Sequence, residues 1–246
     1  MTDWDRMYDC QGDTERVPRL LDQVEREDDA EAWCELRHRL VLEDDWVFPA
    51  SFAALPRLVR LAGTRGRARE LAGAIVRRAG CDHGCEDLLA GCAETISALD
   101  GLLDRYLRTR PSDYLPAFRA LLGARGQYHW AAVLDDFADD FYPVDCPHCG
   151  GETTIAIGGY GRCSAVRDWD LGDVDRRELR PASPEELTGT GRWMYATASR
   201  DGEQVLAEGV AHLFGRAECP RCDSVFSIAE EYALANLPSS GDYPSV

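Results

Sequence analysis

Two short cysteine pairs carry the clearest chemical signal in the sequence. Cys146 and Cys149 are separated by Pro-His, and Cys219 and Cys222 by Pro-Arg. The proline after each first cysteine favours a tight turn, which lets both thiolates of a pair face one ion. A redox C-x-x-C motif needs only one such pair, so two pairs of matching spacing indicate a tetrahedral four-cysteine zinc site.

The number and separation of these thiolates define what such a site can do. Four thiolates complete a tetrahedron and leave no open position, so the single zinc ion is expected to be structural and not catalytic. Residues 150–218 lie between the pairs, far more than the roughly 15–20 residues of a compact zinc ribbon. We therefore predict a zinc-ribbon-type module with a large insertion. His148, inside the first pair, is expected to face solvent or to support a ligand.

A second group of cysteine and histidine residues lies in the first half of the chain: Cys81, His83, Cys85 and Cys92. Cys85 and Cys92 fall on one face of an expected helix, and the other two residues precede that helix in a turn. The group is either a second metal site or a set of small core residues at the start of a helix. The sequence leaves both interpretations open.

The acidic run Asp135–Asp140 places aspartates four positions apart, on adjacent faces of an expected helix. It matches the D-D-x-x-D pattern that holds magnesium diphosphate in isoprenoid synthases. Those enzymes also need a second acidic run, which this sequence does not contain. A solvated helix end, with Phe137 and Phe141 packed inward, is the competing interpretation.

The charge of the chain restricts its chemistry and its partners. The net charge is −17, and all 27 basic residues are arginines. The absence of lysine excludes Schiff-base and P-loop chemistry, and no G-x-S-x-G motif is present. An acidic chain favours a basic protein partner over nucleic acid. A nucleic-acid role would require a local basic patch near the second cysteine pair, from Arg176, Arg177, Arg180, Arg216 and Arg221.

The hydropathy of the sequence indicates a compartment. The N-terminal residues are acidic and show no apolar signal segment, and no stretch reaches the roughly 18–20 apolar residues of a membrane span. Ten cysteines without an export signal are typical of reduced thiols and metal ligands. We expect a cytoplasmic protein that does not bind membranes.

Apolar residues recur with helical spacing through residues 1–145. The first of seven expected helices is marked by Val17, Leu20, Leu21 and Val24. The others cover the segments 32–41, 49–62, 71–79, 88–107, 115–122 and 130–137. Short helices with short connections are typical of a stacked helical array.

A weak internal repeat supports an array. An apolar residue, a proline and a further apolar turn recur around Pro18, Pro56 and Pro116. The first two prolines lie 38 residues apart, close to the roughly 40–47 residues of a HEAT or armadillo unit. The interval to the third proline is longer, so an irregular helical bundle remains the rival interpretation.

The pattern changes after Cys146. Residues 153–157 are β-branched and end in Gly158-Gly159, which predicts a strand and a turn, and residues 163–166 are expected to pair back on it. The remaining segments predict a loop at 180–191, helices at 193–198 and 205–214, a strand at 225–228, a helix at 229–237 and a frayed tail at 238–246.

These features together resemble a group of small bacterial HEAT-repeat-like proteins. The resemblance lies in the helical stretch 48–56, the first C-P-x-C-G turn with the strand 155–158 after it, and Gly191-Arg192-Trp193 and Leu213-Phe214-Gly215 before a second C-P-x-C. It implies a helical array followed by a zinc-ribbon module, and it implies no activity. Asp223 departs from the pattern, because a glycine is usual there, and it must adopt a left-handed backbone conformation.

We therefore predict a mostly α protein in two parts. Residues 1–145 form a HEAT-like α-helical array, residues 146–237 form a smaller α+β zinc-ribbon-type module with an insertion, and residues 238–246 form a flexible tail. The expected function is non-enzymatic protein binding, with an immunity-type inhibitor of a basic toxin as one specific form. Two less favoured functions stay open: an enzyme that uses Asp135–Asp140, and a nucleic-acid-binding zinc protein.

Overall fold

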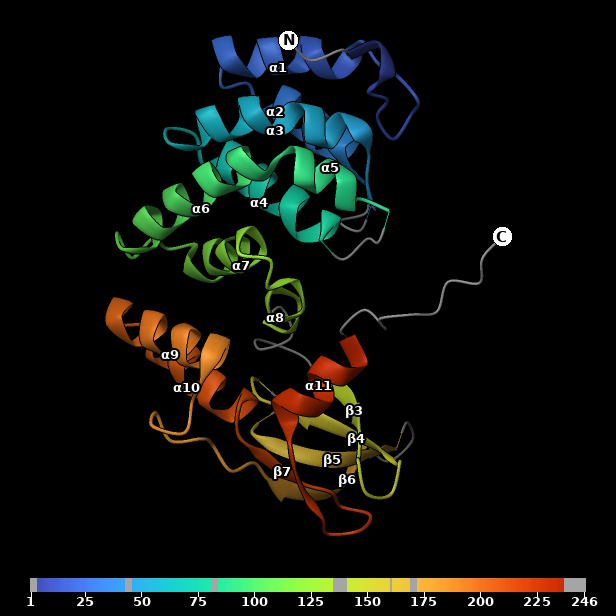
Figure 1. Ribbon diagram of the computed structural model, residues 1–246, viewed down its shortest axis with the longest axis vertical. Helices are drawn as coiled ribbons and strands as arrows, with labels where there is room; N and C mark the ends of the chain where they lie inside the picture. Colours follow the sequence, from blue (N-terminus) through green and yellow to red (C-terminus); the bar gives the residue numbers. More distant parts are fainter. Residues whose placement is uncertain are drawn as a thin grey trace. The chain divides into compact units, whose positions relative to one another are not determined.

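The computed structural model of the protein describes residues 4–42, 46–80, 84–134, 141–159, 161–168 and 172–236. The chain divides into two compact units, residues 1–131 and 132–246. The first is almost entirely helical, and the second combines small antiparallel sheets with helices (Figure 1). The structure therefore confirms a mostly α fold with a smaller α+β part.

The first unit begins with a short 3-10 helix, Trp4–Arg6, and contains a two-residue strand pair, β1 (Val41–Leu42) and β2 (Trp46–Val47). Its α-helices are α1 (Arg16–Arg26), α2 (Ala30–Leu40), α3 (Pro49–Ala62), α4 (Gly66–Ala79), α5 (Glu86–Gly91), α6 (Ala93–Leu107) and α7 (Tyr114–Ala124). Helix α8 (Tyr128–Val133) spans the boundary between the units.

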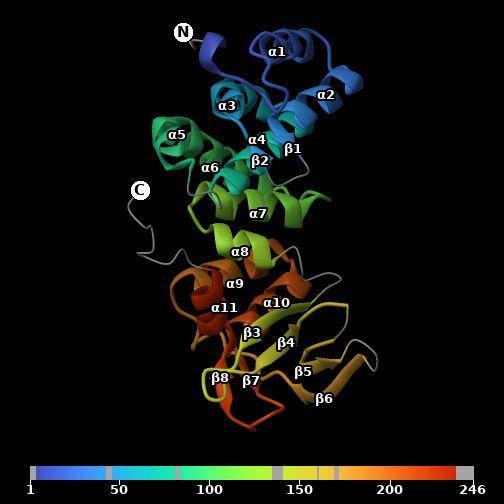
Figure 2. The same ribbon diagram turned by 90° about the vertical axis from the view of Figure 1, so that its right-hand side faces the viewer.

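The helices of the first unit pack in successive pairs. Helix α1 contacts α2, α3 contacts α4, and α6 contacts α7. Between pairs, α3 lies against α1 and α6, while α4 lies against α7 and more weakly against α2. Two layers result, one of α1, α3 and α6 and one of α2, α4 and α7, which can be followed in Figure 2.

Local sequence explains where these helices begin. Asp29 precedes α2 in an extended conformation, and its carboxylate accepts a hydrogen bond from the backbone N–H of Glu31, as an N-cap residue does. Helix α3 opens with Pro49, which needs no hydrogen-bond acceptor in the first turn. The buried Ser51 hydroxyl then accepts from the Phe48 N–H at 3.0 Å and donates to a carbonyl of α2 at 2.6 Å.

One predicted helix is wrong in its extent. Residues 88–107 were expected to form a single helix, but the chain breaks at Cys92, which ends α5 and begins α6. Gly91 immediately before the break has a low helix propensity. Helix α5 has no fully buried side chain, although it contacts α3 and α4.

The crossing of α4 and α7 is unusually close. A Cβ atom on Gly73 would lie 2.6 Å from the Cβ of Ala120, and one on Gly123 would lie 2.7 Å from Cγ of Arg77. Real Cβ atoms do not approach neighbours this closely, so glycine is required at both positions. These two contacts fix how α7 packs on α4.

The second unit contains a four-stranded antiparallel sheet in sequence order. Its strands are β3 (Phe141–Asp145), β4 (Glu152–Ala156), β5 (Cys163–Asp168) and β6 (Gly172–Glu178). A separate antiparallel pair is formed by β7 (Arg216–Glu218) and β8 (Val225–Ser227), and the helices are α9 (Gly189–Asp201), α10 (Gln204–Leu213) and α11 (Ile228–Asn236).

The predicted strands at 153–157 and 225–228 correspond to β4 and β8, and the predicted pairing of β5 with β4 is confirmed. Strands β3, β6 and β7 were not predicted. Strand β3 contains Pro143, which argues against a strand in the sequence and is tolerated here because β3 is an edge strand. Strand β6 is mostly charged or polar and lacks the alternating apolar pattern that marks a strand. Because β3 pairs with β4 along its full length, the second unit begins before residue 146, the start that was expected.

The chain between β4 and β7 makes specific contacts with β7. The Ser164 hydroxyl on β5 donates to the Glu218 carbonyl at 2.7 Å. Arg180, after β6, forms a β-bridge with Arg216. Helices α9 and α10 are joined by Gly202, whose φ of 83° ends α9 in the left-handed conformation, at the break that was predicted.

No helix among the described residues has the length and apolar character needed to cross a membrane.

Candidate metal centre

The first cysteine pair lies in the turn between β3 and β4. The Cys146 N–H donates to the Gly151 carbonyl at 3.0 Å, and the Gly150 N–H donates to the Cys146 carbonyl at 2.8 Å. These two hydrogen bonds close a compact loop around Cys149 and hold its thiol on the same side as that of Cys146.

The second pair, between β7 and β8, repeats this loop. The Cys219 N–H donates to the Ser224 carbonyl at 2.9 Å, and the Asp223 N–H donates to the Cys219 carbonyl at 2.8 Å. The same backbone pattern therefore presents both cysteine pairs, each at the tip of a β-hairpin.

The residue after each pair adopts the left-handed conformation that the loop requires. Gly150 has φ of 67° and Asp223 has φ of 57°. The prediction that Asp223 takes a conformation usually given to glycine is confirmed. Aspartate tolerates this region better than most residues but less well than glycine.

The two hairpins bring all four sulfur atoms together. The Sγ atoms of Cys146, Cys149, Cys219 and Cys222 lie within 4.8 Å of one another. The distances between Cys146 and Cys222 and between Cys149 and Cys219 are both 3.8 Å. A disulfide would require about 2.05 Å, so these are thiols that face one point. Such a cluster can bind a metal ion.

The two thiols within each pair differ in burial, and Cys146 and Cys222 also differ in pKa. Cys146 and Cys219 are buried, while Cys149 and Cys222 are exposed. Burial raises the pKa of the Cys146 thiol to about 11, and hydrogen bonds from Ser224 lower the pKa of the Cys222 thiol to about 6. A bound cation would offset the cost of ionising the buried thiol.

Thr153 on β4 supports the cluster and was not singled out from the sequence. Its side chain is fully buried, and its hydroxyl lies 3.8 Å from Sγ of Cys219. It therefore reaches from one hairpin to a cysteine on the other, as residues behind metal ligands commonly do in metal sites. Its place in the β-branched run after the first pair was the only sequence signal.

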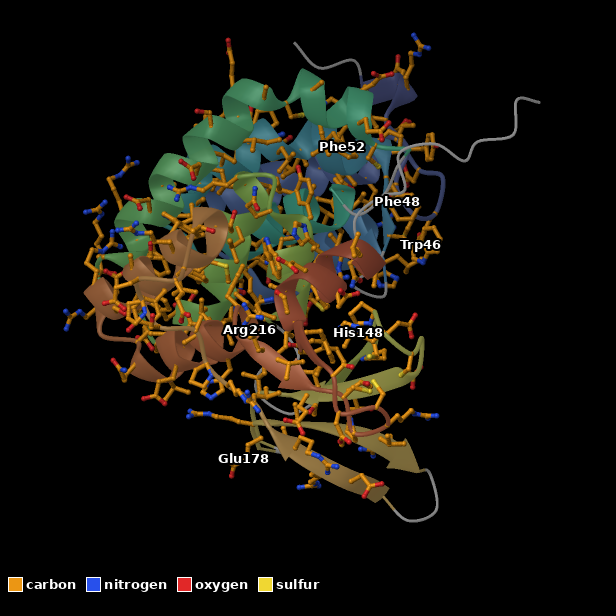
Figure 3. The ribbon with its side chains drawn as sticks, turned by 60° about the horizontal axis from the view of Figure 1, so that its bottom comes forward. Trp46, Phe48, Phe52, His148, Glu178 and Arg216 are labelled. Carbon is orange, nitrogen blue, oxygen red and sulfur yellow. The ribbon has the colours of Figure 1, made fainter. Side chains whose placement is uncertain are left out.

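The remaining predicted candidates have different outcomes. His148 is exposed and does not belong to the group of four cysteines, although Figure 3 shows it beside sulfur atoms, drawn in yellow. Cys81 and His83 lie outside the described residues. Cys85 is buried, and the Cys92 thiol lies 3.8 Å from the Phe52 carbonyl, with its pKa raised by burial.

The four-cysteine cluster is the only group of metal-ligand side chains found among the described residues. Cys163 is buried on β5 and does not belong to it. The acidic run Asp135–Asp140 lies outside the described residues, so the magnesium interpretation stays a prediction.

Carboxylates accompany the arginines of the suggested basic patch. Arg180 lies 3.0 Å from Glu218, and Arg177 lies 3.5 Å from both Glu218 and Asp223. Arg216 projects from β7, and Figure 3 labels it together with Glu178 of β6. These ion pairs lower the positive charge that the patch offers to a phosphate backbone.

Comparison with protein-family models, with curated proteins and with solved structures finds no match. The fold and the centre define a mostly helical protein with a four-cysteine cluster held by two β-hairpins.

Proposed function

We propose that Cys146, Cys149, Cys219 and Cys222 bind one structural zinc ion, and that the protein is a non-enzymatic binding or scaffold protein. The sulfur geometry carries the first part. A tetrahedron with Zn–S bonds of about 2.3 Å has sulfur atoms about 3.8 Å apart, and two distances between the hairpins equal 3.8 Å. A closed set of four thiolates favours zinc in a structural role over a catalytic metal.

Zinc would supply stability where the second unit needs it. The two hairpins belong to separate sheets and are far apart in sequence, so closing the intervening chain costs entropy. Metal–thiolate bonds add on the order of 10 kcal/mol to the folding of such sites at neutral pH. The arrangement supports a zinc-ribbon-type module with β5, β6, α9 and α10 as its insertion.

Metal analysis of the purified protein tests this proposal. About one zinc per chain is expected for a closed four-thiolate site, and less than half of that would contradict it. Cys149→Ser should lose the bound zinc. The matched control is Cys34→Ser, because Cys34 is also exposed but lies outside the cluster. Equal zinc content in the two variants would exclude the assignment.

The first unit supports the binding part of the proposal. Successive helical pairs in two layers are the architecture of HEAT-like arrays, which bind protein partners along an extended face. The net charge of −17 favours a basic partner through electrostatic steering. An immunity-type inhibitor of a basic toxin is the specific form that this charge favours.

Affinity purification from the native host would identify the partner. Its association kinetics would then be measured at low and high salt. A basic protein whose association slows steeply as salt increases is expected. A partner that is acidic, or association that does not depend on salt, would contradict the steering argument. Salt-sensitive binding to a labelled oligonucleotide would favour a nucleic-acid-binding role instead.

A further inference from the structure

The first unit contains a pocket of about 370 Å³, a size typical of small-ligand sites. Helices α2, α4, α6 and α7 and the residue before α7 contribute to its walls. The charged lining residues are Arg37 of α2, Arg69, Glu70 and Arg77 of α4, and Asp113 before α7. The apolar lining residues are Ala74, Leu103, Pro116, Ala117 and Ala120.

The charge of this pocket is opposite to that of the chain. Acidic residues outnumber basic ones by 17 in the whole sequence, yet three of the five charged lining residues are arginines. A guanidinium offers several fixed donors and recognises planar oxyanions in a bidentate manner. The pocket is therefore suited to an anion.

Arg69 is held in place without full use of its donors. Its guanidinium carbon lies 3.4 Å from the centroid of the Tyr106 ring, and its Nη1 donates a long 3.4 Å hydrogen bond to the Ala62 carbonyl. Its Nη2 lies 3.7 Å from Asp113, beyond hydrogen-bond distance. Its Nε is buried and has no acceptor among the described residues. Because Nε has almost no accessible surface, a ligand oxygen would have to meet the terminal nitrogens, whose two contacts are long.

Asp113 does not fill this role, because another group holds it. Its Oδ1 accepts a 2.5 Å hydrogen bond from the Tyr106 hydroxyl. Tyr106 thus fixes both sides of the pair, through its ring for Arg69 and through its hydroxyl for Asp113. The Arg69 guanidinium is pre-oriented before any ligand arrives, which lowers the entropic cost of binding.

The apolar wall of the pocket limits the size of the apolar group that a ligand can carry. Three of its five residues are alanines, and the close approach of Gly73 to Ala120 brings α4 and α7 together beside them. Such a surface accepts a compact apolar group and excludes a large one.

We propose that this pocket binds a small organic acid. Its carboxylate would be held by Arg69 and Arg77, and its short apolar group would rest on the alanines of α4 and α7. The pocket lies within the first unit and shares no residue with the cysteine cluster, so this site and the proposed zinc site succeed or fail separately.

The test is an NMR titration of the full-length, ¹⁵N-labelled protein, observed through backbone amides and arginine Nε–H signals. The probe is isobutyrate, and its neutral isostere isobutyramide is the matched control ligand. Saturable shifts with a Kd on the order of 1 mM are expected for a ligand of this size. The Nε–H signal that Arg69→Lys removes should be among those that shift.

Substitutions of single arginines test whether isobutyrate binds in this pocket. Arg69→Gln and Arg77→Gln should each weaken isobutyrate binding by about tenfold or more, because a charge-assisted contact is lost. Arg108→Gln is the control, since Arg108 is exposed on the surface after α6 and pairs with Asp104. If Arg69→Gln does not fold, Arg69→Lys should still weaken binding, because lysine cannot make the bidentate contact.

Three results would overturn the proposal. One is no saturable shift up to about 50 mM isobutyrate, well above the expected Kd. Another is a lack of specificity, seen either as equal affinity in Arg69→Gln and Arg108→Gln or as an equal response to isobutyramide. The third is inorganic phosphate that binds at the same signals as tightly as isobutyrate, which would assign the pocket to an inorganic anion.

Discussion

At the scale of single residues, the four-cysteine cluster depends on backbone conformation as much as on thiols. Each hairpin tip needs one residue with positive φ after the cysteine pair, and the chain uses Gly150 in one tip and Asp223 in the other. The two hairpins otherwise share their backbone hydrogen bonds. This similarity allows the conformational cost of a side chain at that position to be measured within one protein.

Gly150→Ala should destabilise the protein by about 1 kcal/mol, because alanine disfavours the left-handed region. No atom of the described residues lies within 4 Å of a Cβ at this position, so the loss would reflect backbone strain alone. Asp223→Gly should be neutral or stabilising by less than about 1 kcal/mol, with some loss of the ion pair to Arg177. Urea unfolding midpoints check both changes, and a destabilised Asp223→Gly variant would contradict the strain argument.

At the scale of elements, short-range contacts decide how neighbouring helices pack. The helices of the first unit were predicted from apolar spacing, and the apolar face expected for α1 is fully buried. Spacing did not indicate which helix packs on which. Gly73 and Gly123 on the α4–α7 crossing look in the sequence like ordinary weak points of a helix, and their role is visible only in the folded protein.

Gly73→Ala should therefore destabilise the first unit by about 1–3 kcal/mol through overpacking. Gly101→Ala is the matched control, because Gly101 also lies inside a helix but its Cβ would meet only the end of Arg105 at 3.5 Å among the described residues. The free energy of unfolding of Gly101→Ala should rise by up to about 1 kcal/mol, because alanine has a higher helix propensity than glycine. Chemical denaturation measures the stability of both variants. If both were more stable than the wild type, α4 and α7 would not cross as closely as the structure shows.

The contact between α1 and α2 should depend on pH through Glu35. Hydrogen bonds from Arg16 and Arg39 lower the pKa of Glu35 from 4.5 to about 2. A lowered folded-state pKa means that the stabilisation is present above about pH 4.5 and is lost as the pH falls towards 2. Glu35 is about one-third exposed, so we expect less than about 1 kcal/mol.

At pH 7, Glu35→Gln should have a free energy of unfolding lower than the wild type by that amount. The difference between the two proteins should shrink as the pH falls towards 2. Denaturation of both proteins at pH 7, 4 and 3 gives the difference, with Glu15→Gln as an exposed control. A difference that stays constant over this range would show that Glu35 acts through packing and not through charge.

At the scale of the whole molecule, the chain forms two compact units, and the cysteine cluster lies within the second. The proposed zinc would therefore stabilise one unit selectively. Removing it would leave buried cysteines without a cation and would release the two hairpins from each other.

Chelation should abolish the hydrogen-exchange protection of β3, β4, β7 and β8 while α1–α4 keep theirs. Exchange measured by mass spectrometry, with and without a chelator, resolves the two parts. Equal loss of protection in α3 and α4 would show that both units unfold as one cooperative structure. Restored protection on adding zinc back excludes irreversible damage by the chelator.

The sequence by itself determined the helices of the first unit, the four cysteines of the cluster and the left-handed conformation of Asp223, because these follow from local spacing and backbone preference. It did not show the break at Cys92, nor β3, which contains a proline, nor β6 and β7, which are mostly charged or polar. Only the tertiary structure decided that Cys146 lies next to Cys222 and Cys149 next to Cys219, that Thr153 supports the cluster, and that Arg69 stacks on Tyr106 in a pocket. Those contacts join residues far apart in the chain, and packing, which no local pattern encodes, determines them.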